Sequence, residues 1–128
     1  MTEMFNWNEL AREVVRTGVE RCGFRGEGAI LVMNWISPNL DIRPHSHTFE
    51  QIVVCIEGEF RYHVSDEVFH MVPGSMLRVP ANTVHYVESL GDKVALNLDI
   101  FAPVRDDYKH LVDYQALQFV SSDTIRGT

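Results

Sequence analysis

Between about residue 29 and residue 101, short runs rich in Val, Ile, Phe and Tyr alternate with turn-forming residues. The turns fall at Ser37-Pro38-Asn39, Glu57-Gly58, Ser65-Asp66, Pro73-Gly74, Pro80-Ala81-Asn82 and Gly91-Asp92. β-branched and aromatic side chains favour extended backbone, whereas Gly, Pro, Asn and Asp end it. Many short strands at such intervals are typical of a sandwich or barrel. The pattern therefore predicts an all-β barrel over about residues 28–102.

Both flanks of this region carry helical patterns. Near the start, four apolar residues fall at helical spacing: Trp7, Leu10, Ala11 and Val14. Asn6 can cap a helix here and Gly18 can end it, which predicts a short amphipathic helix over about residues 6–17. Residues 103–128 form a C-terminal extension. Its first part, 105–119, can hold a short helix, and the last residues, SSDTIRGT, are expected to form a solvated tail.

The composition bounds the class of protein. A chain of 128 residues suits one compact domain, and 45% hydrophobic with 23% charged residues is the profile of an ordinary globular protein. The net charge of −7 disfavours nucleic acid and anionic membranes as partners. Cys22 and Cys55 are too few for a disulfide framework, and the N-terminus lacks a signal-peptide pattern. We therefore expect a cytoplasmic protein.

Two histidines and an amide share one face of the chain in the middle of this region. His45 and His47 are two residues apart, so both side chains point to the same side of extended backbone. Gln51 keeps this parity, whereas Glu50 points the other way. His85, after a tight proline turn, can supply a third imidazole. Imidazole nitrogens and an amide oxygen suit a divalent transition metal, which predicts one bound ion.

Two alternatives stand beside this prediction. Glu50 in place of Gln51 would restore a carboxylate ligand but would break the shared face. A metal-free barrel would leave the histidines as packed polar residues. Burying three imidazoles on one interior face without a common partner is costly, which favours the metal site.

The residues around the histidines resemble the two sequence motifs of the cupin superfamily. Residues 45–58 resemble the first motif, H-x-H-x(3,4)-E-x(6)-G, and residues 74–89 resemble the second, G-x(5)-P-x-G-x(2)-H-x(3)-N. The positions that depart from the motifs are Asn39, Gln51, Asn82 and Ser89. Asn82 is a mild change, because asparagine tolerates left-handed backbone. The resemblance implies a jelly-roll barrel, the double-stranded β-helix of cupins, with one metal ion.

The strand after the second motif carries further candidates. Residues 96–101 alternate strictly, which places Asn97, Asp99 and Phe101 on one face. In a barrel with a polar interior this face can point inward, and Asp99 would be a carboxylate suited to acid–base work. Arg105 could hold a substrate carboxylate through paired hydrogen bonds. The alternative has Asp99 in solvent and Arg105 in a surface ion pair.

The run from Leu98 to Tyr108 resembles the D-x-F-[SA]-P-x-R-x-D-[YF] ending of many short single-domain cupins. Among these are enzymes that linearise 4,5-unsaturated uronates during pectin and alginate breakdown. In that group three histidines and a glutamine hold the metal, and the Asp, Phe and Arg of the ending line the site. The resemblance implies a site made of His45, His47, Gln51, His85, Asp99, Phe101 and Arg105.

A neutral fourth ligand, Gln51, affects the charge that the metal ion presents to a substrate. Three imidazoles and an amide leave the ion its full charge, which favours polarising an oxygenated substrate over stabilising a high-valent metal. We therefore expect a lyase or isomerase that rearranges a small carboxylated, sugar-acid-like substrate. A cupin dioxygenase and a non-catalytic small-molecule-binding cupin are the alternatives. The metal, whether Mn, Fe, Ni, Cu or Zn, is left open, and we expect a homodimer.

Other residues complete the predictions. Further cations for an acidic substrate are Arg43, Arg61 and Arg78. Cys55 shares the parity of Gln51 and is expected to be a small interior filler. Tyr62 and Tyr86 have parity opposite to their neighbouring histidines and are expected in packing or a subunit contact. The histidines expected outside the site are His63, His70 and His110.

Overall fold

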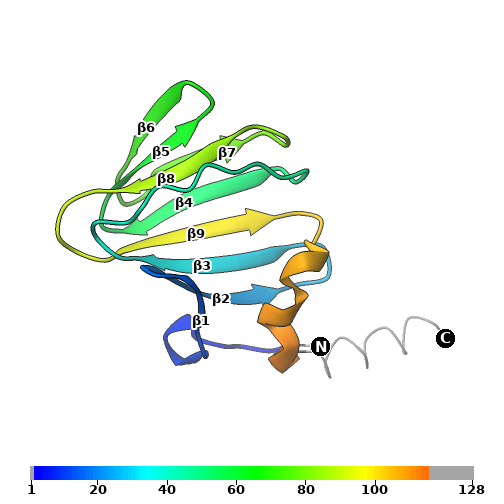
Figure 1. The fold of residues 1–128 in the computed structure, drawn as a ribbon. Coiled ribbons are helices and arrows are strands. Elements are labelled where there is room, and N and C mark those ends of the chain that lie inside the picture. Colours follow the sequence, from blue (N-terminus) through cyan, green and yellow to red (C-terminus); the bar gives the residue numbers. More distant parts are fainter. Residues whose placement is uncertain (1, 116–128) are drawn as a thin grey trace.

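The computed structural model describes residues 2–115 and consists of two antiparallel sheets, a jelly-roll arrangement that confirms the all-β prediction (Figure 1). The larger sheet has the strand order β1-β2-β3-β9-β4-β7, and the smaller has β6-β5-β8. The strands are β1 (Glu13–Arg16), β2 (Val19–Arg25), β3 (Ile30–Ile36), β4 (Gln51–Glu57), β5 (Phe60–Val64), β6 (Glu67–Met71), β7 (Met76–Val79), β8 (His85–Ser89) and β9 (Ala95–Phe101).

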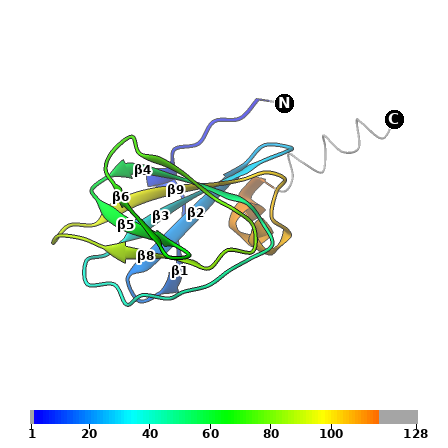
Figure 2. The same cartoon turned by 90° about the horizontal axis from the view of Figure 1, so that it is seen from above.

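The two sheets face each other (Figure 2). The core lies between them, where alternate residues of facing strands meet. On β4, Val53 and Cys55 point inward, and on β5, Phe60 does so from the opposite sheet. All three are almost completely buried. Period-two alternation in short strands therefore builds this interior, and the predicted filler role of Cys55 agrees with its place in the core.

The N-terminal segment differs from the helix predicted over residues 6–17. Its helix is a single 3₁₀ turn, η1 (Trp7–Glu9), where the Asn6 side chain accepts a hydrogen bond from the Asn8 amide. The chain then forms β1, which pairs with β2 through a hairpin around Gly18, whose φ is 89°. The helix prediction was wrong beyond the first turn, because β-branched residues in β1 gain a strand partner and Gly18 serves as a hairpin turn.

The C-terminal extension begins with η2 (Asp106–Gln115), a kinked 3₁₀ segment that lies against β2. The Tyr114 hydroxyl donates to the Gly23 carbonyl at 2.6 Å, and the Arg25 amide donates to the Gln115 side chain at 3.0 Å. These contacts confirm a short C-terminal helix, while the predicted tail and residues 116–119 lie outside the described residues. Within residues 2–115 no helix has the length and apolarity needed to cross a membrane.

The turn before β8 connects the two histidine-bearing segments. Asn82 adopts left-handed backbone with φ of 62°, and its amide donates to the His47 carbonyl at 2.7 Å. The prediction that asparagine can take the place of the motif glycine is thereby confirmed. A residue without glycine's freedom or asparagine's tolerance would strain this turn.

Asn82→Ala is expected to lower the free energy of unfolding by about 1 kcal/mol, since alanine disfavours positive φ. Asn82→Gly should stay within about 0.5 kcal/mol of the wild type, because glycine adopts the same backbone freely. Urea denaturation followed by circular dichroism measures both. Equal losses in the two variants would contradict a backbone cause and point to the asparagine side chain.

Candidate metal centre

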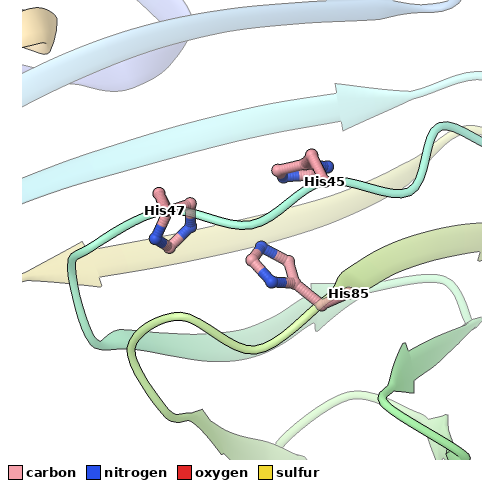
Figure 3. A group of neighbouring side chains, drawn as sticks. All are labelled: His45, His47 and His85. Atoms are coloured by element: carbon pink, nitrogen blue, oxygen red, sulfur yellow. The ribbon is translucent and has the colours of Figure 1, made fainter.

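Three imidazoles, those of His45, His47 and His85, converge on one point (Figure 3). His45 and His47 lie on the segment that leads into β4, and His85 begins β8. The backbones of His45 and His85 form an isolated bridge, with amide-to-carbonyl distances of 3.1 and 2.8 Å. One ligand nitrogen from each ring lies within 4.8 Å of the other two. This spacing allows a single ion to contact all three rings.

The backbone fixes which nitrogen of each ring faces the centre. The Nδ1 atoms of His45, His47 and His85 lie 2.9, 2.8 and 2.8 Å from the carbonyl oxygens of residues 43, 49 and 83. Because a carbonyl oxygen only accepts, each neutral ring carries its proton on Nδ1. All three Nε2 atoms then keep a lone pair, which is the form that binds a metal.

His85 carries a buried ring nitrogen that lacks a hydrogen-bond partner within residues 2–115. Its Nε2 atom is buried and hydrogen-bonds to none of the described residues. Burial is the main cause that lowers the pKa of His85 to about 4, and burial also lowers the pKa of His47. Both rings are therefore neutral at pH 7. A buried acceptor without a donor costs about 1–3 kcal/mol, which a metal ion at this point would recover.

Gln51 presents its oxygen to the same point. Its Oε1 atom lies 3.1 Å from His47 Nε2, while its Nε2 atom donates to Asp99 Oδ1 at 2.8 Å and to the Tyr62 hydroxyl at 3.1 Å. With the His47 proton on Nδ1, two lone pairs face each other across that gap. Such a contact is favourable only with a cation between the two atoms. The residues therefore fit a divalent ion held by three nitrogens and one oxygen.

Glu50 points away from this centre. It is exposed, and its carboxylate accepts a hydrogen bond from Arg78 Nε at 2.6 Å. Gln51, by contrast, is 4% exposed and lies among the histidines. The structure thus places Gln51, and not Glu50, in contact with the His47 imidazole.

Asp99 lies beside Gln51 on the inner face of β9. Besides Gln51, Asn97 donates to its Oδ1 at 2.9 Å and Asn34 donates to its Oδ2 at 3.0 Å. Burial raises the pKa of Asp99 to about 6, against the opposing effect of these three amides. Sequence reasoning missed Asn34, whose signal was one polar residue within the apolar run Ile30–Ile36.

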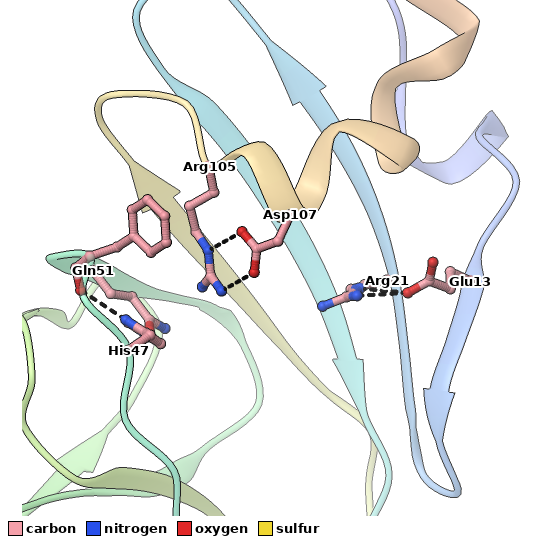
Figure 4. A network of polar contacts seen from close by, with 7 residues as sticks. Glu13, Arg21, His47, Gln51, Arg105 and Asp107 are labelled. Carbon is pink, nitrogen blue, oxygen red and sulfur yellow. Dashed lines mark hydrogen bonds and ion pairs between the residues drawn. The ribbon is translucent and has the colours of Figure 1, made fainter.

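Phe101 and Arg105 close the interior near the histidines. The Phe101 ring is buried and lies 5.9 Å, centroid to centroid, from that of His47. Arg105 is 6% exposed, and its guanidinium donates to both Asp107 carboxylate oxygens at 3.0 and 2.6 Å (Figure 4). The same guanidinium stacks on three rings: Phe49, Phe101 and Tyr108. It is therefore engaged by partners of its own chain.

A cavity of about 150 Å³ adjoins the centre. Its polar lining comprises Arg16, Arg21, Asn34, His45, His47, Gln51, Tyr62, Asn97, Asp99 and Tyr108. Tyr62 packs inside, as expected from its parity, yet its hydroxyl touches Gln51 and its ring stacks on His85. Sequence reasoning missed this contact and also the two arginines, which come from the segment predicted as a helix and from β2.

The remaining histidines have partners elsewhere. His63 Nε2 lies 2.8 Å from a Glu88 carboxylate oxygen and its ring stacks on Tyr86. His70 pairs with Glu59 at 2.7 Å, and His110 pairs with Glu13 at 2.5 Å. Of the three further cations predicted for an acidic substrate, Arg61 lies 3.5 Å from Glu88 and Arg78 pairs with Glu50. These side chains do not line the cavity beside the three imidazoles.

The sequence from residue 36 to residue 101 matches the family described as Cupin domain, so the chain belongs to the cupins. Three solved structures share the fold. KdgF from a Halomonas species is 24% identical with a TM-score of 0.76, and the match covers 84% of this chain and 98% of that one. An RmlC-like cupin from Shewanella frigidimarina is 22% identical with a TM-score of 0.72, covering 84% of this chain and 96% of that one. The polyketide cyclase RemF from Streptomyces resistomycificus is 18% identical with a TM-score of 0.72, covering 83% of this chain and 82% of that one. No curated protein matches the sequence significantly.

His85→Ala is expected to weaken metal binding by about tenfold or more, because it removes a buried ligand nitrogen. His63→Ala serves as the matched control, since His63 pairs with Glu88 outside the centre. After loading and desalting, metal per chain is measured by mass spectrometry, and the melting temperature is recorded with and without metal. Equal metal content in both variants would rule out the site.

Gln51→Glu is expected to lower the free energy of unfolding by about 1–3 kcal/mol in chelator, because a carboxylate then faces Asp99 without a donor. Adding Asp99→Asn should restore most of that loss, since the asparagine amide can donate to the new carboxylate. Urea denaturation of the two single variants and the double variant measures the coupling. Simple additivity would show that the two side chains do not depend on each other.

Proposed function

We propose that the protein is a metal-dependent enzyme that rearranges a small oxygenated, carboxylated substrate by a lyase- or isomerase-type reaction. The observation that carries this proposal is the position of Asp99. Its carboxylate lines the same cavity as His45, His47 and Gln51, so a proton acceptor adjoins the predicted metal centre. The resemblance to enzymes that linearise unsaturated uronates supports the same class of substrate.

The metal, when bound by the three histidines and Gln51, would polarise an oxygen of the substrate and thereby acidify the neighbouring protons. Asp99 would take up such a proton. Its Oδ2 accepts one hydrogen bond, from Asn34, whereas Oδ1 accepts two, so Oδ2 has the more available lone pair. A carboxyl pKa of about 6 suits a group that takes and returns a proton near neutral pH.

The neighbours of Asp99 keep it in place during such a transfer. The amides of Asn34, Asn97 and Gln51 hold the carboxylate from three strands: β3, β9 and β4. These donors are uncharged, so they orient Asp99 without neutralising it. Tyr62 supports Gln51 from the opposite sheet. Rearrangement of an enol ether to an open-chain carbonyl compound needs proton movement of this kind and no oxidant.

Asp99→Asn is expected to lower the turnover of a 4,5-unsaturated uronate by about 100-fold or more, because the amide cannot accept the proton. The assay is run without oxygen on protein whose metal content has been measured. Asp66→Asn, on the exposed β5–β6 turn, is the control and should retain full turnover. Unchanged turnover by Asp99→Asn with metal bound would refute the role of the base. Strict dependence on oxygen would instead support the dioxygenase alternative.

A further inference from the structure

We propose that Arg16 and Arg21, from the β1–β2 hairpin, bind the carboxylate of the substrate beside the metal centre. The inference rests on the proposed function, which requires an acidic substrate, and it assigns that acid group to residues outside the cupin motifs. Both arginines line the cavity that holds His45 and Asp99.

The register of the sheet brings Arg21 to the inner face. Arg21 on β2 pairs with Asn34 on β3, and Asn34 pairs with Asn97 on β9. Side chains of directly paired residues lie on the same face, so the three form one inward row across adjacent strands. Asn34 and Asn97 both hold Asp99. Arg21 is therefore two strands from Asn97, and the proposed base lies two residues further along β9, which makes the backbone separation from Arg21 about 12 Å at the usual strand spacing and rise.

The charges of the cavity favour an anion. Among the described residues that line it, the charged side chains are Arg16, Arg21 and Asp99. Asp99 already accepts hydrogen bonds from three amides, and a divalent ion would add two positive charges. Even when Glu13, which pairs with Arg21, is counted beside Asp99, the local charge is then positive within a chain whose net charge is −7. A substrate carboxylate would reduce this local excess.

Both arginines retain donors for a ligand. Arg21 uses Nε and Nη2 on Glu13 at 2.9 and 2.7 Å, which leaves Nη1 without a hydrogen bond to any described residue. Figure 4 shows Glu13 holding one edge of the guanidinium while the remaining nitrogen points away from it. Arg16 donates from Nη1 to the Asp41 carbonyl at 2.8 Å, so its Nε and Nη2 atoms are unengaged within residues 2–115.

Arg43 strengthens the case for an anion near Arg16. Burial, followed by the charge of Arg43, lowers the pKa of Arg16, while the charge of Asp41 opposes part of that shift. The two like charges are close enough to repel, and a carboxylate near them would relieve that repulsion. Arg105 has the same two donor atoms occupied by Asp107 as Arg21 has by Glu13. It differs in that three rings enclose its guanidinium and that it does not line the cavity. We therefore place carboxylate recognition on the hairpin.

The test uses calorimetry on the metal-loaded full chain with two sugars that differ in the acid group, D-galacturonate and D-galactose. Arg16→Gln and Arg21→Gln are each expected to weaken galacturonate binding about tenfold or more, since each removes charged hydrogen-bond donors. Galactose binding should change by less than about twofold. Circular dichroism establishes that each variant is folded. Should Arg21→Gln unfold, Arg21→Lys, which lacks the planar fork, takes its place.

Two controls separate recognition from packing and from net charge. Glu13→Gln removes the same ion pair as Arg21→Gln, together with the pair between Glu13 and His110, but keeps the Arg21 cation, so galacturonate binding should be retained or improved. Arg12→Gln removes one positive charge from the same hairpin outside the cavity, where Arg12 stacks on Trp35, and should leave binding unchanged. An equal loss in Glu13→Gln and Arg21→Gln would overturn the assignment.

The outcomes also separate this inference from the proposed function. Loss of galacturonate affinity only in the two arginine variants, in a protein that converts no unsaturated uronate, would keep the carboxylate site and refute the enzyme. Turnover that persists with unchanged KM in both arginine variants would refute the carboxylate site and keep the enzyme. Absence of galacturonate binding by the wild type at millimolar concentration would also overturn the site.

Discussion

The hydrogen bond from Gln51 to Asp99 is the contact on which the candidate site depends. A primary amide has one donor end and one acceptor end, and Asp99 accepts from the donor end at 2.8 Å. The Gln51 oxygen must then face His47. The usual cupin glutamate could not make this contact, because two carboxylates would meet. The Gln51 amide and the buried Asp99 carboxylate therefore form one hydrogen-bonded unit, in which the carboxylate requires a neutral donor at position 51.

This unit exists because the topology places β4 beside β9. In that pairing Val53 lies opposite Asp99, so Gln51, two residues earlier on the same face of β4, can reach the carboxylate. Tyr62 reaches Gln51 from the opposite sheet and stacks on His85. Strands far apart in the sequence thus bring the predicted fourth ligand, the proposed base and a supporting phenol to one cavity.

Local sequence patterns predicted the strands well and the N-terminal segment poorly. The alternation in residues 96–101 correctly predicted which side chains of β9 share a face, because side chains of a strand alternate between its two faces. Residues 13–16 satisfied a helical spacing and still formed a strand, since pairing with β2 satisfies their backbone groups. The helix propensity of such a short segment is weak, and hydrogen bonding to a neighbouring strand outweighs it.

The sequence by itself determined the histidine pattern, the side of the strand on which Gln51 lies and the turn at Asn82, because parity and backbone tolerance are local properties. The tertiary structure alone decided that Asn34 holds Asp99 and that Arg21 shares their row. Those neighbours come from separate strands, and only sheet order and register bring them together. The sequence thus predicted a metal-binding cupin, while the order of its strands decided what surrounds the centre.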